Sequence, residues 1–132
     1  YYGPENLSIK NPFEASIQNG AEVVRRILAN TPQETSGYRL FYNVNFPPVP
    51  AAGVKGIRLA TQGFREGLGF STEPHMAPSG RRFLWIKGGD QRRPTAEGSD
   101  AQLNLQGYIS VTPMRADLTA HDAMESLGGI NS

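Results

Sequence analysis

The sequence predicts an α/β fold, and two patterns along the chain support this. An amphipathic helix pattern over residues 12–29 leads into a β-prone, apolar stretch at residues 38–44. Shorter β-prone segments follow, separated by loops that hold many of the 15 glycines and 10 prolines. Helix and strand signals in this arrangement are typical of α/β proteins. The 132 residues have the size of one domain or of a large part of one.

The helix pattern begins with a strong start signal. Asn11 can cap the first turn, Pro12 suits the first helical position, and Glu14 stands where a capping-box carboxylate is found. Apolar residues then recur at helical spacing, which predicts an amphipathic helix with one apolar stripe made of Phe13, Ile17, Ala21, Val24 and Leu28. Asn30 and Pro32 end the pattern.

The stretch at residues 38–44 predicts an interior strand. Leu40, Phe41 and Tyr42 make it apolar on both faces, as in a strand that is covered on both sides. A helix that leads into such a strand is similar to the second part of a βαβ unit. Because the chain opens at Tyr1 without an initiator methionine, we expect the first strand of this unit to precede Tyr1.

The rest of the chain predicts short elements separated by loops. Strands are predicted at residues 57–61, 82–87 and 107–112. Pro113 should limit the last of them. Residues 63–80 predict an irregular connection, and residues 90–99 predict a loop or the tip of a hairpin arm. Thr119 can cap a short final helix at residues 120–127.

Composition narrows the class of protein. Thirteen basic and twelve acidic residues give a formal net charge of +1, which provides no strong field for a nucleic acid or an anionic membrane. No apolar stretch approaches the roughly 20 residues of a membrane-spanning helix. The absence of cysteine excludes disulfides and thiolate metal sites, and it fits a reducing compartment. We therefore expect a cytoplasmic protein without a membrane or nucleic acid partner.

Four blocks of sequence carry a resemblance to a known family. They are NVNFP at 43–47, KGIRLATQG at 55–63, PSGR at 78–81 with WI and GG shortly after it, and GSD at 98–100 followed by GYISVTP at 107–113 and DLTA at 117–120. Together, and in this order, they resemble the C-terminal half of the SurE family, the survival-protein nucleotidases. Ser79, Lys87 and Ser99 depart from the family pattern, and these departures concern the details of the arm and its loops.

The resemblance implies a fold and an activity. It implies a metal-dependent nucleotidase that hydrolyses the phosphate monoester of nucleoside 5′- or 3′-monophosphates with Mg or Mn. Residues 1–55 would complete a Rossmann-like α/β core, and residues 56–132 would form a β-rich extension with a hairpin arm and a C-terminal tail. In this family the arm and the tail exchange between subunits, so we expect a homodimer or a tetramer.

The resemblance also implies where the metal is held. In the family an N-D-D-G motif near the N-terminus holds the metal, together with a serine and an asparagine from later loops. The aspartates of this chain include no adjacent pair; they are Asp90, Asp100, Asp117 and Asp122. A hard divalent cation needs several convergent oxygen ligands. We therefore assign neither a metal ligand nor a catalytic residue to this chain, and the alternative is a non-catalytic association or nucleotide-binding module derived from such an enzyme.

Three residues are candidates for the substrate side of the site. Ser99 and Asp100 follow a glycine, and a carboxylate there can line the mouth of an active site. These residue types more commonly cap a turn through backbone hydrogen bonds, and we favour that interpretation. Asn45 lies at the end of the strand at 38–44, so it can reach the crevice where α/β sheets bind ligands or hold the proline-rich loop that follows.

Three further residues are candidates for contacts between subunits. Asp117 and His121 are four residues apart, so a helical turn would bring them within hydrogen-bonding reach. This pair can act as an oriented general acid, but we favour a structural pair that fixes the tail on a partner subunit. Trp85 can stack on a base, although aromatic residues on strands usually pack against protein. A serine hydrolase built on Ser110 is rejected because this serine lies inside a strand without a nucleophile elbow.

Overall fold

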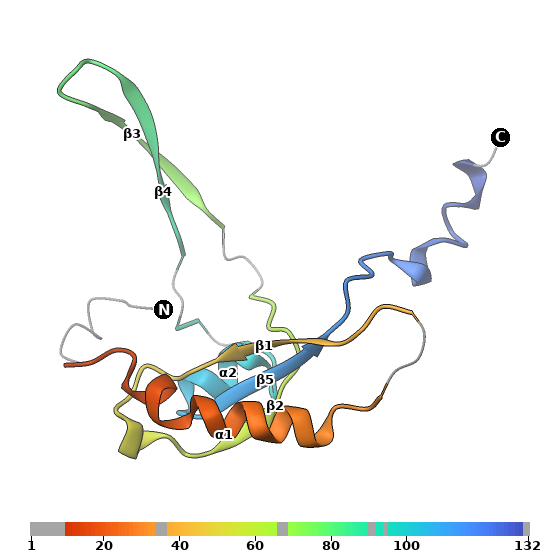
Figure 1. Cartoon of the computed structure of the whole chain (residues 1–132). Helices are drawn as coiled ribbons and strands as arrows, with labels where there is room; N and C mark the ends of the chain where they lie inside the picture. The colour runs from red at the N-terminus through yellow and green to blue at the C-terminus, as the bar shows by residue number, and fades with distance from the viewer. Residues whose placement is uncertain (1–9, 34–36, 66–68, 90–91, 94, 131–132) are drawn as a thin grey trace.

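The computed structural model describes residues 10–33, 37–65, 69–89, 92–93 and 95–130 (Figure 1). The helices of this part are α1 (Glu14–Asn30) and α2 (Asp100–Leu105). Its strands are β1 (Phe41–Asn45), β2 (Ile57–Leu59), β3 (Ser71–Met76), β4 (Arg82–Lys87) and β5 (Ile109–Met114). Short 3-10 turns lie at Ala51–Gly53, His121–Ala123 and Gly128–Ile130. The predicted α/β class is confirmed.

The central sheet has three strands in the order β1-β5-β2. β5 pairs antiparallel with β1, where Asn45 lies opposite Ser110, and parallel with β2, where Ile57 lies opposite Ile109. This pairing joins strands from both sides of the expected division near residue 55. β5 is buried on both faces, since Ile109 is 0% exposed and Thr112 is 4% exposed.

The hydrophobic core lies between α1 and the sheet. Val23 of α1 packs with Ile109 and Val111 of β5, and these three residues are at most 4% exposed. Partly buried hydrophobic residues surround them: Ile27, Tyr42, Val44, Phe46, Val54 and Ile57. The core therefore depends on one helix and one face of a small sheet.

The predicted strand at 38–44 exists as β1, but its predicted interior position is wrong within the described residues. β1 pairs with β5 on one side and forms an edge of the sheet. Phe41 is 47% exposed, so the apolar residues of this stretch are only half covered. The interior position belongs to β5, which lies between β1 and β2.

α1 confirms the predicted helix at 12–29 but starts two residues later. The side chain of Asn11 accepts a hydrogen bond from the Phe13 N–H at 3.1 Å, so it does satisfy a donor of the first turn. Glu14 does not close the expected capping box, since its Oε2 accepts from the Ala51 N–H at 3.4 Å. Glu14 thus connects the start of α1 to the loop after β1.

The apolar stripe predicted for α1 is not the face that packs on the sheet. Ala15 and Val23 are the buried residues of the helix, whereas Phe13, Ile17, Val24 and Leu28 are each more than half exposed. Helical periodicity identifies the apolar positions, but it does not tell which of them faces this sheet. The packed face is set by contact with β5 and its neighbours.

β3 and β4 form an antiparallel hairpin that projects away from the sheet and α1 (Figure 1). The strand β4 confirms the prediction at 82–87. The irregular connection predicted over 63–80 is wrong, because residues 71–76 form β3 despite Pro74, which a two-stranded hairpin tolerates at an edge. The tip of the arm lies at residues 77–81, where the Ala77 N–H donates to the Arg81 carbonyl at 2.9 Å.

The arm tip was predicted instead at 90–99, and that prediction is wrong. Residues 95–98 lead into α2, a short helix that the sequence did not predict, while residues 90, 91 and 94 lie outside the described residues. β5 continues through Pro113 to Met114. The proline is tolerated because β2 pairs with β5 only as far as Val111, so Pro113 has a strand neighbour on the β1 side alone.

The C-terminal segment extends away from the sheet (Figure 1). The helix predicted at 120–127 is wrong, since two 3-10 turns separated by an ordinary turn occupy this region. Gly128 begins the second 3-10 turn. The segment exposes large hydrophobic residues, and Leu118 at 91% exposed is the extreme case.

Candidate functional site

Ser99 and Asp100 lie at the start of α2, where both side chains bind backbone N–H groups. Ser99 is fully buried, and its Oγ accepts from the Gln102 N–H at 3.3 Å. The Gln102 side chain in turn accepts from the Gly98 N–H at 2.8 Å. This reciprocal pair resembles a capping box, and it satisfies donors that the first turn of a helix leaves free.

Asp100 connects α2 to the segment after β2. Its Oδ1 accepts from the Gly63 N–H at 2.8 Å and from the Ala101 N–H at 2.7 Å. A Cβ at position 63 would come within 2.7 Å of the same oxygen, so only glycine allows this approach. The contacts of Ser99 and Asp100 are therefore those of a cap and an inter-segment connection.

Asn45 lies in a polar row on one face of the central sheet. Asn45 is opposite Ser110, and Asn43 is opposite Thr112 in the same register. The hydroxyls of Ser110 and Thr112 are buried and have no hydrogen-bond partner within the described part of the chain. Strand alternation places Ser110 and Thr112 on one face of β5, and the pairing with β1 adds the two asparagines to that face.

Asn45 is not joined to the two residues at the start of α2. No hydrogen bond connects Asn45 with Ser99 or Asp100 in the ranges that the structure describes. The structure brings Ser99 and Asp100 together and leaves Asn45 on a separate element. The buried position of Ser110, without a bond to His121, agrees with the rejection of a serine hydrolase.

Asp117 and His121 are in contact in the C-terminal segment. His121 Nε2 lies 2.9 Å from Asp117 Oδ2, and Asp117 Oδ1 accepts from the Thr119 N–H at 2.9 Å. Hydrogen bonds from the Thr119 hydroxyl, from His121 and from the Thr119 N–H lower the pKa of Asp117 from 3.8 to about 2. The predicted contact between the two residues is therefore present. A turn that leads into the 3-10 segment at His121–Ala123 makes it, and not an α-helix.

The low pKa of Asp117 predicts how the tail turn responds to acid. A carboxyl whose pKa is lower in the folded than in the unfolded state stabilises the fold when the pH is above the unfolded-state pKa. This stabilisation is lost as the pH falls through the folded-state pKa. The turn should thus be intact above pH 3.8 and open as the pH falls through about 2. NMR titration of the Asp117 carboxyl measures this directly.

Two variants separate the cause of this low pKa from a general effect of the tail. Thr119→Ala removes the largest contribution, so the pKa of Asp117 should rise toward 3.8. Ser126→Ala is the matched control, because its hydroxyl donates to the Ala123 carbonyl and does not reach Asp117. An Asp117 pKa that Thr119→Ala leaves unchanged would contradict the assignment.

Trp85 lies on β4 in the projecting hairpin and is 58% exposed. It shares one face of the hairpin with His75 and Phe83, and the His75 ring lies 5.8 Å from Phe83 and 6.0 Å from Trp85, centroid to centroid. The other face carries Pro74, Met76, Leu84 and Ile86. The hairpin therefore exposes an aromatic face and an aliphatic face, and a two-stranded hairpin is marginally stable without further packing.

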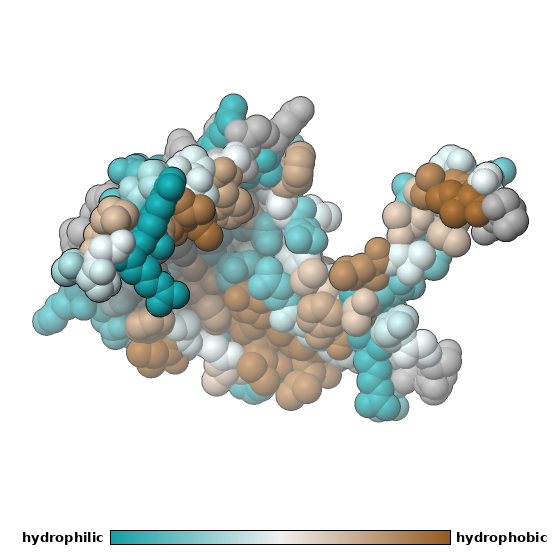
Figure 2. All heavy atoms as spheres, turned by 90° about the horizontal axis from the view of Figure 1, so that it is seen from above, coloured by the Kyte–Doolittle hydropathy of each residue, from teal (hydrophilic) through white to brown (hydrophobic). Residues whose placement is uncertain are grey.

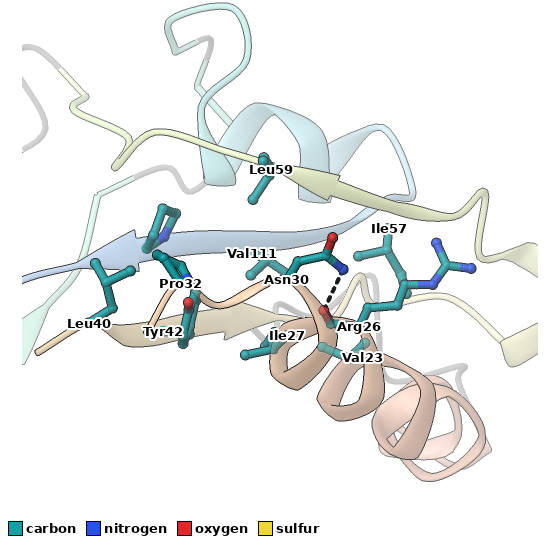
Figure 3. Close-up of a pocket in the computed structure, with 11 residues that line it drawn as sticks. Val23, Arg26, Ile27, Asn30, Pro32, Leu40, Tyr42, Ile57, Leu59 and Val111 are labelled. Atoms are coloured by element: carbon teal, nitrogen blue, oxygen red, sulfur yellow. Dashed lines mark hydrogen bonds between the residues drawn. The ribbon is translucent and has the colours of Figure 1, made fainter. Parts of the chain in front are cut away.

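A cavity of about 440 Å³ lies between the C-terminal half of α1 and the sheet (Figure 3). Its lining is mostly apolar, and the residues are Val23, Arg26, Ile27, Asn30, Pro32, Leu40, Tyr42, Ile57, Leu59, Val111 and Pro113. None of the predicted site residues lines it. An apolar wall of this kind suits protein side chains better than a phosphate group.

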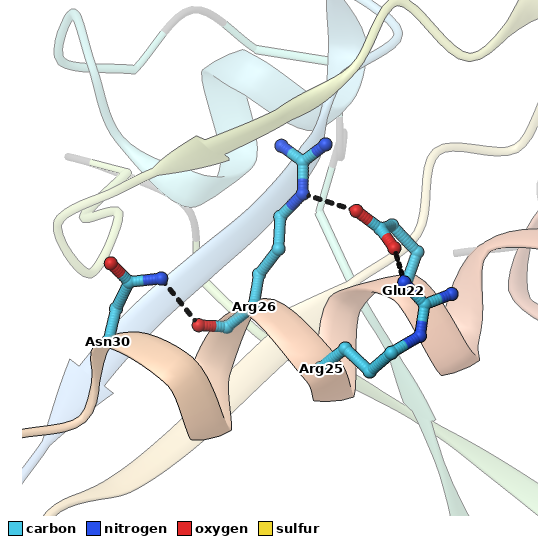
Figure 4. Close-up of polar contacts among 4 residues, drawn as sticks. All are labelled: Glu22, Arg25, Arg26 and Asn30. Carbon is cyan, nitrogen blue, oxygen red and sulfur yellow. Dashed lines mark hydrogen bonds and ion pairs between the residues drawn. The ribbon is translucent and has the colours of Figure 1, made fainter.

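Arg26 is the charged residue of this cavity, and its charge is already balanced. Its Nε donates to Glu22 at 2.7 Å, and Arg25 also pairs with Glu22 (Figure 4). The hydrogen bond from Arg26 is the main cause that lowers the pKa of Glu22. The cavity therefore offers no unpaired cation for an anionic ligand.

Two further features of the described residues concern metal binding and membrane crossing. No group of three or more histidine, cysteine, aspartate or glutamate side chains there is placed to hold a metal ion. In the same residues, no helix has the length and hydrophobicity needed to cross a membrane.

Comparison with known proteins gives consistent matches along the whole chain. The chain is 82% identical over 132 residues to 5′-nucleotidase SurE from Roseobacter denitrificans, and the matched region covers all of this chain and 51% of that protein. It is 65% identical over 127 residues to 5′-nucleotidase SurE from Ruegeria pomeroyi, covering 96% of this chain and 49% of that one. No family model matches the chain.

A solved structure shows the same fold. The crystal structure of the SurE protein from Aquifex aeolicus matches with a TM-score of 0.68 and 29% identity, over 99% of this chain and 49% of that chain. The chain therefore spans about half the length of the curated relatives and of the solved structure that it matches.

Proposed function

The chain belongs to the SurE family, whose C-terminal half it represents, and we propose that it is part of a metal-dependent nucleotidase acting on nucleoside 5′- or 3′-monophosphates. The observation that carries this proposal is the 82% identity, over every residue of the chain, to a protein named 5′-nucleotidase SurE. At this identity the two proteins share their fold and the side chains that support it.

We place the metal site in the other half of the protein. Mg and Mn bind several oxygen ligands at once, and the described residues hold no suitable group. Asp100 is also a poor ligand here, because its Oδ1 already accepts two backbone hydrogen bonds. A bound metal would supply an activated water and neutralise phosphate charge, and in this proposal its ligands come from the other half.

The role proposed for this half is subunit association. The projecting hairpin and the C-terminal segment both expose hydrophobic surface (Figure 2). Trp85 of the hairpin is 58% exposed, and Ile130 of the C-terminal segment is 74% exposed. Exposed apolar surface of this extent favours contact with protein. Trp85 on the hairpin, and Asp117 with His121 in the tail, would lie at these contacts in a homodimer or tetramer.

A second role proposed for this half is to flank the active site. Asn45 belongs to a polar row on the sheet, and the buried hydroxyls in that row support a polar environment there. Ser99 and Asp100 would act mainly by fixing the α2 turn beside the substrate entrance. These three residues would thus position the site, and the chemistry would come from the other half.

Phosphate release tests the division of labour between the two halves. The chain should release no phosphate from nucleoside monophosphates, with or without Mn, because its described residues hold no suitable group of metal ligands. A protein that joins the first half of the Roseobacter denitrificans relative to this chain should release phosphate with Mn and lose that activity with EDTA. The inorganic phosphate is measured directly.

Other outcomes of this experiment would change the proposal. Mn-dependent turnover by the chain alone would place the metal site here and overturn the division. A joined protein that folds and binds nucleoside monophosphate but releases no phosphate would favour the non-catalytic nucleotide-binding module.

A further inference from the structure

α1 carries two apolar faces, and only one of them packs on the sheet. Val23 and Ile27 form the packed face, and Ala15 is buried as well. The second face, here called the α1 stripe, consists of Ile17, Val24 and Leu28, which are 69%, 54% and 73% exposed. At about 3.6 residues per turn, the α1 stripe lies about a third of a turn from the packed face.

The charged residues of α1 do not lie on the α1 stripe. Glu22, Arg25 and Arg26 form their own ion pairs on a third face of the helix (Figure 4). Single exposed hydrophobic residues are normal on protein surfaces, but a continuous apolar stripe indicates a surface that another element covers. The α1 stripe therefore needs a partner that packs alongside the helix.

The sheet points to the same side-by-side arrangement. Among the described residues both edges of the central sheet are open, and the edge strand β1 exposes 47% of Phe41. In α/β proteins the helices lie next to one another on the face of a wider sheet. A strand added beside β1 would bring its connecting helix next to α1.

We infer that the α1 stripe is the docking surface for the half of the SurE polypeptide that this chain does not include. The matched relatives continue for about as many residues again, because the chain covers only 51% and 49% of them. The inference rests on family membership and is independent of the proposed nucleotidase activity. It assigns a specific face of one helix to the contact between the two halves.

A second copy of this chain is the competing occupant. Stable association of separate proteins buries roughly 800 Å² on each partner. Three side chains on one helix provide much less than this. A segment of the same polypeptide does not need so large an area, because it is covalently joined and loses little translational and rotational freedom on docking.

Cysteine labelling tests this inference, because the chain contains no cysteine. Val24→Cys and Leu28→Cys place a thiol on the α1 stripe, and Gln18→Cys places one on the charged face as the matched control. Each variant is made in this chain and in the joined protein, in which any native cysteines of the first half are replaced by serine. The rate of reaction with a maleimide is measured in both.

The expected result is specific to the α1 stripe. Labelling at Val24→Cys and Leu28→Cys should be at least about tenfold slower in the joined protein than in this chain, since a buried thiol reacts only when the structure opens. Labelling at Gln18→Cys should be unchanged. Equal rates at the stripe positions, or equal slowing at all three positions, would overturn the inference.

Two further readouts keep the outcomes apart. Protection of the stripe in this chain alone that increases with protein concentration would assign the surface to a second copy, and would also overturn the inference. Phosphate release is measured on the same joined protein. Phosphate release without protection of the α1 stripe would contradict only the docking surface. Protection of the stripe without phosphate release would contradict only the proposed function.

Discussion

Ile109→Ala is expected to lower the free energy of unfolding of the chain by about 2–5 kcal/mol, the usual cost of removing a large aliphatic side chain from a core. Ile109 is 0% exposed and lies in the central strand β5, against Val23 of α1. The core is small, so few neighbouring side chains can move to fill the space. A domain of ordinary stability has only about 5–15 kcal/mol in total, so the loss should be large in proportion.

Urea denaturation followed by circular dichroism measures this effect. Leu59→Ala is the matched control, because it removes a similar side chain from the neighbouring strand β2, where Leu59 is 77% exposed. The control should change the free energy of unfolding by about 0.5 kcal/mol or less. Equal losses in the two variants would show that β5 is not the centre of the core.

Ile86→Lys is expected to convert the proposed dimer or tetramer into monomers. Ile86 is 67% exposed and shares the aliphatic face of the hairpin with Leu84, Met76 and Pro74. If this face packs on a partner subunit, the variant places an ammonium group in an apolar contact, which is strongly unfavourable without a counter-ion. The fold of each chain should be unaffected, because the hairpin projects away from the core (Figure 1).

Light scattering during size-exclusion chromatography gives the mass of the particles. The single tryptophan, Trp85, provides a second readout, because its emission should shift to longer wavelength when the hairpin becomes solvated. Ala29→Lys is the control, since it adds the same charge on the exposed polar side of α1. If the Ile86→Lys variant keeps the particle mass and the tryptophan emission of the original chain, the aliphatic face of the hairpin is not part of the subunit interface.

Local sequence patterns located most of the elements but not their surroundings. The start signal at Asn11 and the apolar spacing after it located α1, and the β-prone run at 82–87 located β4. β3 was missed because Pro74 and the surrounding glycines resemble a loop. α2 was missed because its six residues are too few to show a helical period.

The candidate site shows the same division between local and long-range information. Local chemistry placed Ser99 at a cap and Asp117 beside His121, because these contacts join residues close in sequence. The bond from Gly63 to Asp100 and the pairing of Asn45 with Ser110 join distant segments. No periodicity within one segment encodes such contacts, so the polar row on the sheet could not be predicted.

The ordered sequence blocks determined the family by resemblance. Side-chain periodicity and capping act over a few residues, and they determined the α/β class and the positions of α1, β1, β2, β4 and β5. The tertiary structure alone decided that β5 takes the interior position, that Val23 and not Val24 enters the core, and that the arm turns at residues 77–81. The physical reason is that burial depends on which distant strand packs against a residue. An apolar side chain on α1 has the same local preference on either face, and only β5 distinguishes them.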